Sequence, residues 1–473
     1  MSVGAGKKER GVMASKPTNH EPANRTKLTL RKVATYASLA VGALVLVCVL
    51  VFLLFPDIYI NGYFKKQIIK AFTRAYPSYS IRLAHVHYNI WENRIGCDGI
   101  AITSIDSAFS CRIDKFSVSG IAWLQIILQG DVASKDINGL VADAREIALT
   151  FRQSQYELRC GRLGVSVPDS EIWAEALELH PLVGDDIFFA SSKFRRSRFR
   201  IVLPQCRIAG ADCIGLLQGK TYRARSVKVN DASFDILVNM DTPCNKNSSR
   251  PLMPNEGLSL IKNITQVNSL NIINGQVKYA ERYIIGSAPA ELTFDSIQLS
   301  AEGITNHADP GAAAVIRGQG KFMKTSKIKI FMVIPVAGPK TSLRYSGSFS
   351  EMDLSRLNSF LETGEGLRIK SGILQSATFD INVIAGRASG AVRAMYKDMH
   401  IAFLNRRTGS ESGVFNRITS LLTNVLKIRG TNMPDKSGSF KIGEVKYSRK
   451  RDDTFFQLIW FSLRSGLGDV VGF

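Results

Sequence analysis

The spacing of apolar residues changes three times along this chain. Val33–Phe55 carries no charge over 23 residues, and a helix of that length spans about 35 Å, enough for a hydrocarbon core of about 30 Å. The next segment, residues 61–77, repeats with the helical period: Ile68 and Ile69 lie opposite Lys65 and Lys70. This helix is expected either to cap the end of a sheet or to lie on a membrane surface.

From Tyr79 onward the period becomes two, which is typical of β-strands. Short alternating runs are separated by Gly, Asn, Asp and Ser, and long helical patterns are few. The fold class is therefore predicted to be mainly β: a single N-terminal transmembrane helix followed by an elongated, curved antiparallel sheet, forming a groove or partly closed, with a few capping helices.

Two runs show how such a sheet places its apolar side chains. In Lys327–Val336 the alternate positions Ile328, Ile330, Met332 and Ile334 form one continuous apolar face. In Gly390–Leu404 the apolar positions change phase near Lys397–Asp398, which predicts a bulge or strong coil there. The candidate lipid-facing residues are Ile328, Ile330, Met332, Ile334, Met399, Ile401 and Phe403.

Two helices are expected within the strand-rich part, near residues 352–362 and 412–428. The second places six apolar residues on one side, so it either covers the sheet or serves as a mobile lid; they are Val414, Phe415, Ile418, Leu421, Leu422 and Val425. The predicted organisation is a disordered basic tail (1–32), the transmembrane helix (33–55), a first β-rich part (56–243), a linker (244–257) and a second β-rich part (258–473).

Charge fixes the expected orientation. The formal net charge is +21, and residues 1–32 hold eight Lys or Arg against two Glu. The positive-inside rule then places the tail in the cytoplasm and everything after Phe55 across the membrane. Removing the tail's +6 leaves +15 on the far side. A basic domain there fits anionic lipid headgroups better than nucleic acid, which is not expected as a partner.

Catalytic and metal-binding patterns are missing from the sequence. It contains no phosphate-binding loop, nucleophile elbow or HExxH motif. His85 and His87 share a strand face but lack a third ligand nearby, and His400 with Asp398 is expected to be a solvated pair. The chain is therefore predicted to be no enzyme and to need no cofactor or metal. Six cysteines follow the span, and either disulfides or buried thiols remain open for them.

Both ends of the strand-rich part carry recognisable segments. They are "FKKQIIKAFTRAYPSYSIRLAHVHYNIWENRIGCDGIAI" after the span, then "IKSG", "GAVRAMYKD", "IRGTN" and "KIGEVKYSR" near the end. From the span to Ile102, and again over Met352–Gly466, the chain resembles the AsmA-like superfamily of bacterial envelope proteins. The resemblance implies an inner-membrane anchor, a periplasmic groove-forming β-sheet, and a role in lipid transport between membranes or in outer-membrane assembly.

Together these observations predict a single-pass inner-membrane protein with its N-terminus in the cytoplasm and its bulk in the periplasm. Its expected partners are lipids, among them anionic phospholipid, and envelope proteins. The predicted function is to bind or shield lipid acyl chains in a β-sheet groove. The alternative is an envelope scaffold that transports nothing and holds assembly partners. An envelope enzyme would need polar groups converging near His85 and His87.

Overall fold

The computed structural model describes residues 41–47, 56–89, 91–121, 137–245, 247, 249–307, 311–336, 341–404 and 428–472. The chain divides into two compact units, Met1–Tyr59 and Ile60–Phe473. In the first unit residues 41–47 are helical, while the tail 1–32 and most of the expected span lie outside the described residues. Within the described part of the chain, no helix has both the length and the apolar character that crossing a membrane requires.

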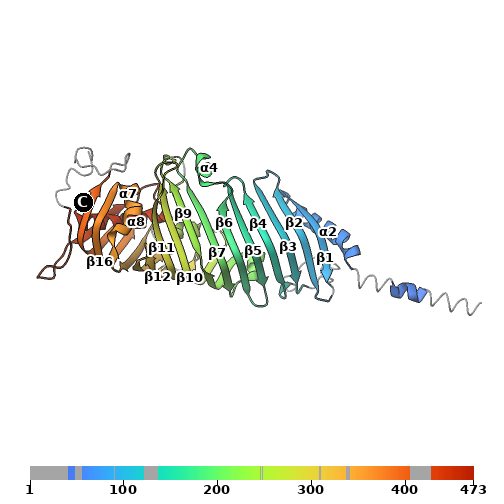
Figure 1. The fold of residues 1–473 in the computed structure, drawn as a ribbon. Coiled ribbons are helices and arrows are strands. Elements are labelled where there is room, and N and C mark those ends of the chain that lie inside the picture. The colour runs from blue at the N-terminus through green and yellow to red at the C-terminus, as the bar shows by residue number, and fades with distance from the viewer. Residues whose placement is uncertain are drawn as a thin grey trace, which may run out of the picture. The chain divides into compact units, whose positions relative to one another are not determined.

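The second unit is mainly β, as predicted, and its described strands form one 18-stranded sheet (Figure 1). The strands are β1 (Tyr79–Asn89), β2 (Arg94–Ser104), β3 (Phe109–Ser119), β4 (Val141–Phe151), β5 (Tyr156–Ser166), β6 (Glu171–Pro181), β7 (Ser197–Ala209), β8 (Thr221–Asn230), β9 (Ser233–Asn239), β10 (Ile264–Arg282), β11 (Ala290–Thr305), β12 (Ala313–Phe322), β13 (Ser326–Pro335), β14 (Leu343–Phe349), β15 (Met352–Asp353), β16 (Leu367–Ile384), β17 (Arg387–Phe403) and β18 (Ile442–Ser448). The helices are α2 (Pro56–Ala75), α4 (Asp185–Ala190), α5 (Cys213–Leu217), α6 (Pro254–Ser259), η2 (Leu354–Leu357), α7 (Asn358–Glu365) and α8 (Phe455–Val471).

The sheet is mixed, where a purely antiparallel one was expected. Neighbouring strands from β1 to β7 pair antiparallel in chain order, and so do the long strands from β10 onward. Between them, β8 and β9 follow one another in line, antiparallel to β7 and parallel to β10. A parallel pair needs a long crossover, and residues 240–263 supply it. The expected linker 244–257 lies in this crossover.

This topology gives the first half of the sheet two rims. The first rim carries the β1–β2, β5–β6 and β7–β8 connections together with the start of β10. The second rim carries the β2–β3, β4–β5 and β6–β7 connections.

A line of interrupted pairings crosses the strands midway between the rims. At this fold line the regular pairing skips one residue of every strand from β1 to β7: Ala84, Gly99, Asp114, Glu146, Gly161, Ala176 and Pro204. On alternate strands the skipped residue has positive φ, 61° at Gly99, 51° at Glu146 and 50° at Ala176. The side-chain alternation therefore shifts by one residue in every strand at the same level, which keeps the apolar residues of both halves on one face.

The phase switch predicted near Lys397–Asp398 is confirmed as the same kind of feature. Asp398 has φ of 56°, and the register between β16 and β17 shifts on both sides of Ser371. Because the shift occurs at Asp398, Tyr396 and Met399 both face the core.

One face of the sheet is apolar along its whole length. A single cross-strand row runs through Val86, Cys97, Phe116, Ala144, Leu163, Ala174 and Cys206. Towards the C-terminus the row continues into the residues around Phe379 and Val392, which pair with each other.

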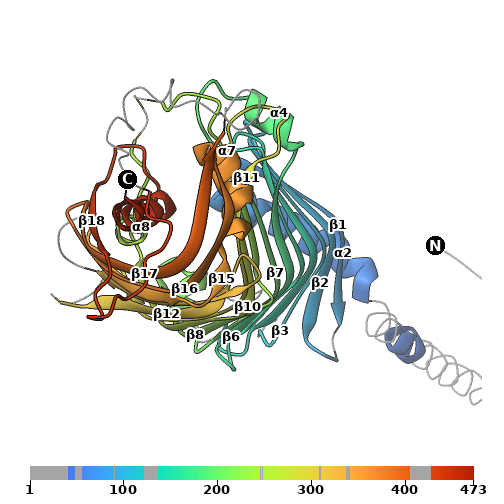
Figure 2. The ribbon, with the colours of Figure 1, turned by 60° about the vertical axis from the view of Figure 1, so that its left-hand side comes forward.

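In the last third of the sheet this face is filled by the chain itself. The sheet curls around α8 (Figure 2), and Leu458 of α8 packs with Tyr345, Ile381 and Val445. Met253 of the crossover joins the same cluster with 1% of its surface exposed. At the other end, Ile68 and Ile69 of α2 pack against β1 and β2 around Leu83, as expected for a capping helix.

Candidate functional site

Over β4–β7 the side chains of the apolar face are more exposed than those in the filled part of the sheet. Eight residues flank the fold line on the apolar face, and we call them the open face: Ile147, Leu149, Leu158, Leu177, Leu179, Ile201 and Leu203 on the side of the second rim, and Leu163 on the side of the first rim. Seven are half-buried and Leu163 is 37% exposed. None belongs to a buried core cluster of the described residues.

The contrast with the filled part shows that the open face has no cover of its own among the described residues. Ile381 and Val392, on the same face further along the sheet, are 0% exposed beneath α8. Partly exposed aliphatic side chains that adjoin one another in this way are typical of surfaces that bind a partner or ligand.

The opposite face of the same strands is polar and internally paired. Asp143 accepts hydrogen bonds from Arg145 and from Arg162, at 3.1 and 2.6 Å. Glu157 pairs with Arg159 at 2.7 Å and lies 3.2 Å from His180. Successive residues of these strands therefore point to opposite faces, with the charged side chains on the outer face and the aliphatic side chains on the open face.

Two thiols lie in the rows of the open face. Cys160 pairs with Ile147 and Leu177, and Cys206 pairs with Ala174. Burial raises the pKa of both thiols, which favours their neutral form at neutral pH. All six cysteines of the described residues are free, so the thiol alternative holds and Cys206 does not bridge to Cys213.

The candidate residues from β13 and β17 lie on the same apolar face, but in its filled part. Met332, Ile334 and Met399 are each 6% exposed, and the four others are partly buried beside them. Met332 and Ile334 pack with Leu458 and Leu463 of α8. Met399 shares a cluster with Phe360 of α7. These side chains have partners within the chain, so the open face is the better candidate for an external ligand.

The other candidates differ in what the structure says of them. The six residues of the predicted lid, Val414 to Val425, lie outside the described residues. The helix expected at 352–362 appears as η2 and α7. His400 lies 3.0 Å from the hydroxyl of Ser371, and His87 lies 3.7 Å from Asp98 with both side chains half exposed. No group of three metal-binding side chains occurs among the residues described.

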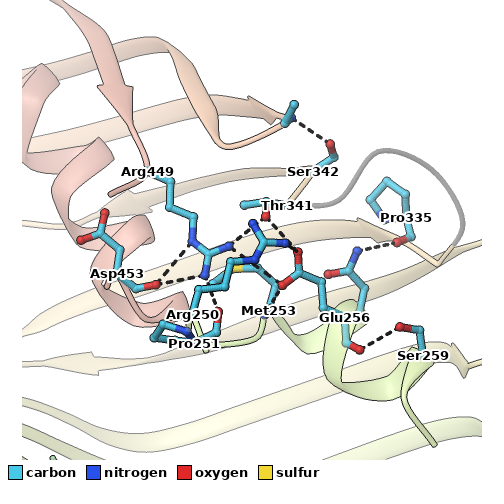
Figure 3. A network of polar contacts seen from close by, with 12 residues as sticks. Arg250, Pro251, Met253, Glu256, Ser259, Pro335, Thr341, Ser342, Arg449 and Asp453 are labelled. Carbon is cyan, nitrogen blue, oxygen red and sulfur yellow. Dashed lines mark hydrogen bonds and ion pairs between the residues drawn. The ribbon is translucent and has the colours of Figure 1, made fainter. Parts of the chain in front are cut away.

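A buried polar network secures the plug formed by α8 and the crossover (Figure 3). The Arg449 guanidinium donates to the backbone oxygens of Pro251 and Asp453 and to the hydroxyl of Thr341. Glu256 accepts from Arg250 at 2.7 Å, from Thr341 at 3.1 Å and from the Met253 N–H at 3.0 Å. Burial opposes ionisation of Glu256, but these donors and the nearby arginines hold its pKa below the ordinary value of 4.5.

Of the four strands that carry the open face, β7 was predicted from the alternation in Phe199–Gly210, whereas β4, β5 and β6 were absent from the sequence-based strand predictions. The signal was present: "REIALTF", "YELRC" and "ALELHP" alternate with period two, and the alternation slips by one residue at Glu146, Gly161 and Ala176. A strict period-two search breaks each strand into pieces of about four residues, too short to stand out.

Among the described residues, the surface of this site is therefore apolar, with thiols and without a cluster of polar side chains. No family model matches the chain, and a search of curated proteins finds no relative that would assign it to a family.

Proposed function

We propose that the open face over β4–β7 binds the acyl chains of lipids. The observation that carries the proposal is the unbroken set of aliphatic side chains across four strands, half-exposed on a face that the chain fills elsewhere. Burying one methylene group there contributes about 0.8 kcal/mol, so an acyl chain laid across the strands gains substantial free energy without a polar contact.

The proposed setting is the bacterial envelope. The uncharged run Val33–Phe55 and the basic tail before it support a single-pass anchor in the inner membrane with the sheet in the periplasm. The resemblance to the AsmA-like superfamily supports a role in moving lipid between membranes or in assembling the outer membrane. No covalent step is needed, and the proposal includes no catalytic residue.

A specific observation favours the scaffold alternative for the C-terminal part. There the apolar face is plugged by α8 and the crossover, and the buried Glu256–Arg449 network holds that plug in place. The two functions can share one chain, with lipid on the open face and partners on the plugged end.

Bound lipid can be measured directly on the full chain extracted in mild detergent. We expect lipid to co-purify in stoichiometric amount by mass spectrometry. Replacing Leu158 and Leu177 together by Asp should remove most of it. The matched control replaces Ala148 and Val202 by Asp, because these residues lie on the outer face, in the cross-strand row between the rows of Leu158 and Leu177. Wild-type protein without lipid, or equal loss in both double variants, would overturn the proposal.

A further inference from the structure

Exposed apolar side chains gather on the first rim, away from the open face, where two short helices end side by side. Leu216 and Leu217 close α5, and Leu260 and Ile261 follow α6. All four are exposed, Leu217 to 54% and Leu260 to 66%. We call these four residues the rim patch.

Backbone pairing and side-chain hydrogen bonds hold the two segments together. Ile264 at the start of β10 pairs with Thr221 at the start of β8. The Asn263 side-chain amide donates to the Gly219 carbonyl oxygen. The Asn306 amide donates to the carbonyl oxygens of Ile261 and Asn263, at 2.7 and 2.8 Å. The rim patch is therefore a built surface formed by two separate connections.

Cations lie close to the rim patch in the sequence. Lys220 follows Leu217 by three residues, Lys262 follows Ile261 directly, and Arg223 and Arg225 lie on β8; all four are exposed. Among the described residues, none of these four side chains forms an ion pair. The pKa of Asp212 is lowered by hydrogen bonds from Thr221 and the Gly215 N–H and, to a smaller extent, by the charge of Arg223. Asp212 itself accepts hydrogen bonds from Thr221 and from the Gly215 N–H. Asp169, on the same rim, accepts from Ser166, and Glu171 lies at the start of β6.

We propose that the rim patch docks on the surface of an anionic bilayer. Leucine and isoleucine side chains at the tips of two connections can enter the boundary between headgroups and acyl chains, while lysine and arginine beside them contact lipid phosphates. The charge imbalance favours this partner over a protein surface: four exposed cations lie close in sequence to the four aliphatic side chains, and two carboxylates of this rim, Asp169 and Asp212, already accept hydrogen bonds within the chain. The proposal does not depend on lipid binding by the open face.

Vesicle binding by the full chain tests this docking. The protein is held in nanodiscs of phosphatidylcholine, so that its N-terminal apolar segment is already in lipid. Sedimentation with sucrose-loaded vesicles then reports binding through the rest of the chain. We expect binding to vesicles that contain phosphatidylglycerol, weak binding to pure phosphatidylcholine, and a fall in binding as salt is raised.

Variants separate the rim patch from other surfaces. Leu217→Ser with Leu260→Ser should lower binding at least tenfold, and Lys262→Glu should lower it about fivefold or more, since one cation near an anionic surface contributes roughly that factor. Matched controls lie on the second rim: Ile105→Ser, at a residue 76% exposed, and Lys193→Glu. The Leu158→Asp, Leu177→Asp variant should still bind vesicles if the two sites are independent.

Three results would overturn the proposal. One is wild-type protein that ignores anionic vesicles. Another is a rim-patch variant that binds like the wild type. The third is equal loss in the second-rim controls, which would reduce the effect to general charge. Retained far-UV circular dichroism in each variant ensures that the loss is not unfolding.

Discussion

Gly466 of α8 lies directly against Gly443 of β18, with no side chain between helix and strand. A Cβ atom added to Gly443 would overlap the carbonyl oxygen of Gly466, and one added to Gly466 would press on Val392 and Val445. This close approach lets α8 lie deep in the curled end of the sheet (Figure 2), where it forms the plug that distinguishes the C-terminal part from the open face.

Gly443→Ala should therefore loosen the plug. We expect the free energy of unfolding to fall by about 1–3 kcal/mol, because the added methyl group forces α8 away from β18. Gly257→Ala is the matched control, since a Cβ there has open space. Urea denaturation of both variants checks the prediction, and equal midpoints would contradict the proposed contact.

The plug should also weaken in acid. Glu256 has a lowered pKa in the folded state, so its contribution to stability is present above its unfolded pKa of about 4.5 and is lost as the pH falls through the folded value. Glu256→Gln should lower stability at neutral pH and flatten the acid dependence in this range. Denaturation midpoints between neutral pH and about pH 3 measure it. Glu444→Gln, at an exposed ion pair, should leave the acid dependence unchanged, and an unaltered profile in Glu256→Gln would refute the assignment.

Side chains of α8 protect the edge of β18 that pairs with no described strand. Asp469 accepts the Glu444 N–H at 2.8 Å, and Ser465 accepts the Lys446 N–H at 3.2 Å. Asp469→Ala should expose that edge and cost about 1–2 kcal/mol, whereas Asp469→Asn keeps an acceptor. Hydrogen exchange at the Glu444 amide should accelerate in the alanine variant alone. Unchanged exchange in both variants would show that the cap is unimportant.

Replacing Ala176 at the fold line by glycine is expected to stabilise the protein. The φ of 50° at Ala176 is costly for any residue with a Cβ, so Ala176→Gly should stabilise the protein by about 0.5 kcal/mol. At Ala148 of β4, two residues from the fold line and without positive φ, the same change should destabilise by a similar amount. Thermal or urea denaturation gives the sign directly, and destabilisation at both positions would argue against the fold line as a strained feature.

Local patterns in the sequence predicted much of this fold. Alternation gave the class, the strand around Ile330 and its apolar side, and the phase switch at Asp398, because each depends on neighbours within about ten residues. The α8 helix was not predicted, although its sequence carried a readable signal: Thr454 and Gln457 form a capping box at its start.

Pairing and packing between residues far apart in the sequence could not be predicted from such local patterns. The parallel pairing of β8 and β9 with β10 depends on where the crossover returns, and the sequence of residues 240–263 does not encode a direction. Whether Met332 faces ligand or core depends on α8, more than a hundred residues later in the chain. For the same reason the sequence located an apolar face but not its uncovered part.

Photo-crosslinking on β6 tests lipid binding by the open face most directly. Leu177 and Glu178 are adjacent, but Leu177 lies on the open face and Glu178 on the outer face, opposite Arg159. A benzophenone amino acid is placed at either position in the full chain, irradiated in membranes, and the protein is weighed intact. We predict a lipid adduct at position 177 and none at position 178. Absence of lipid at 177, or equal adducts at both positions, would contradict the account.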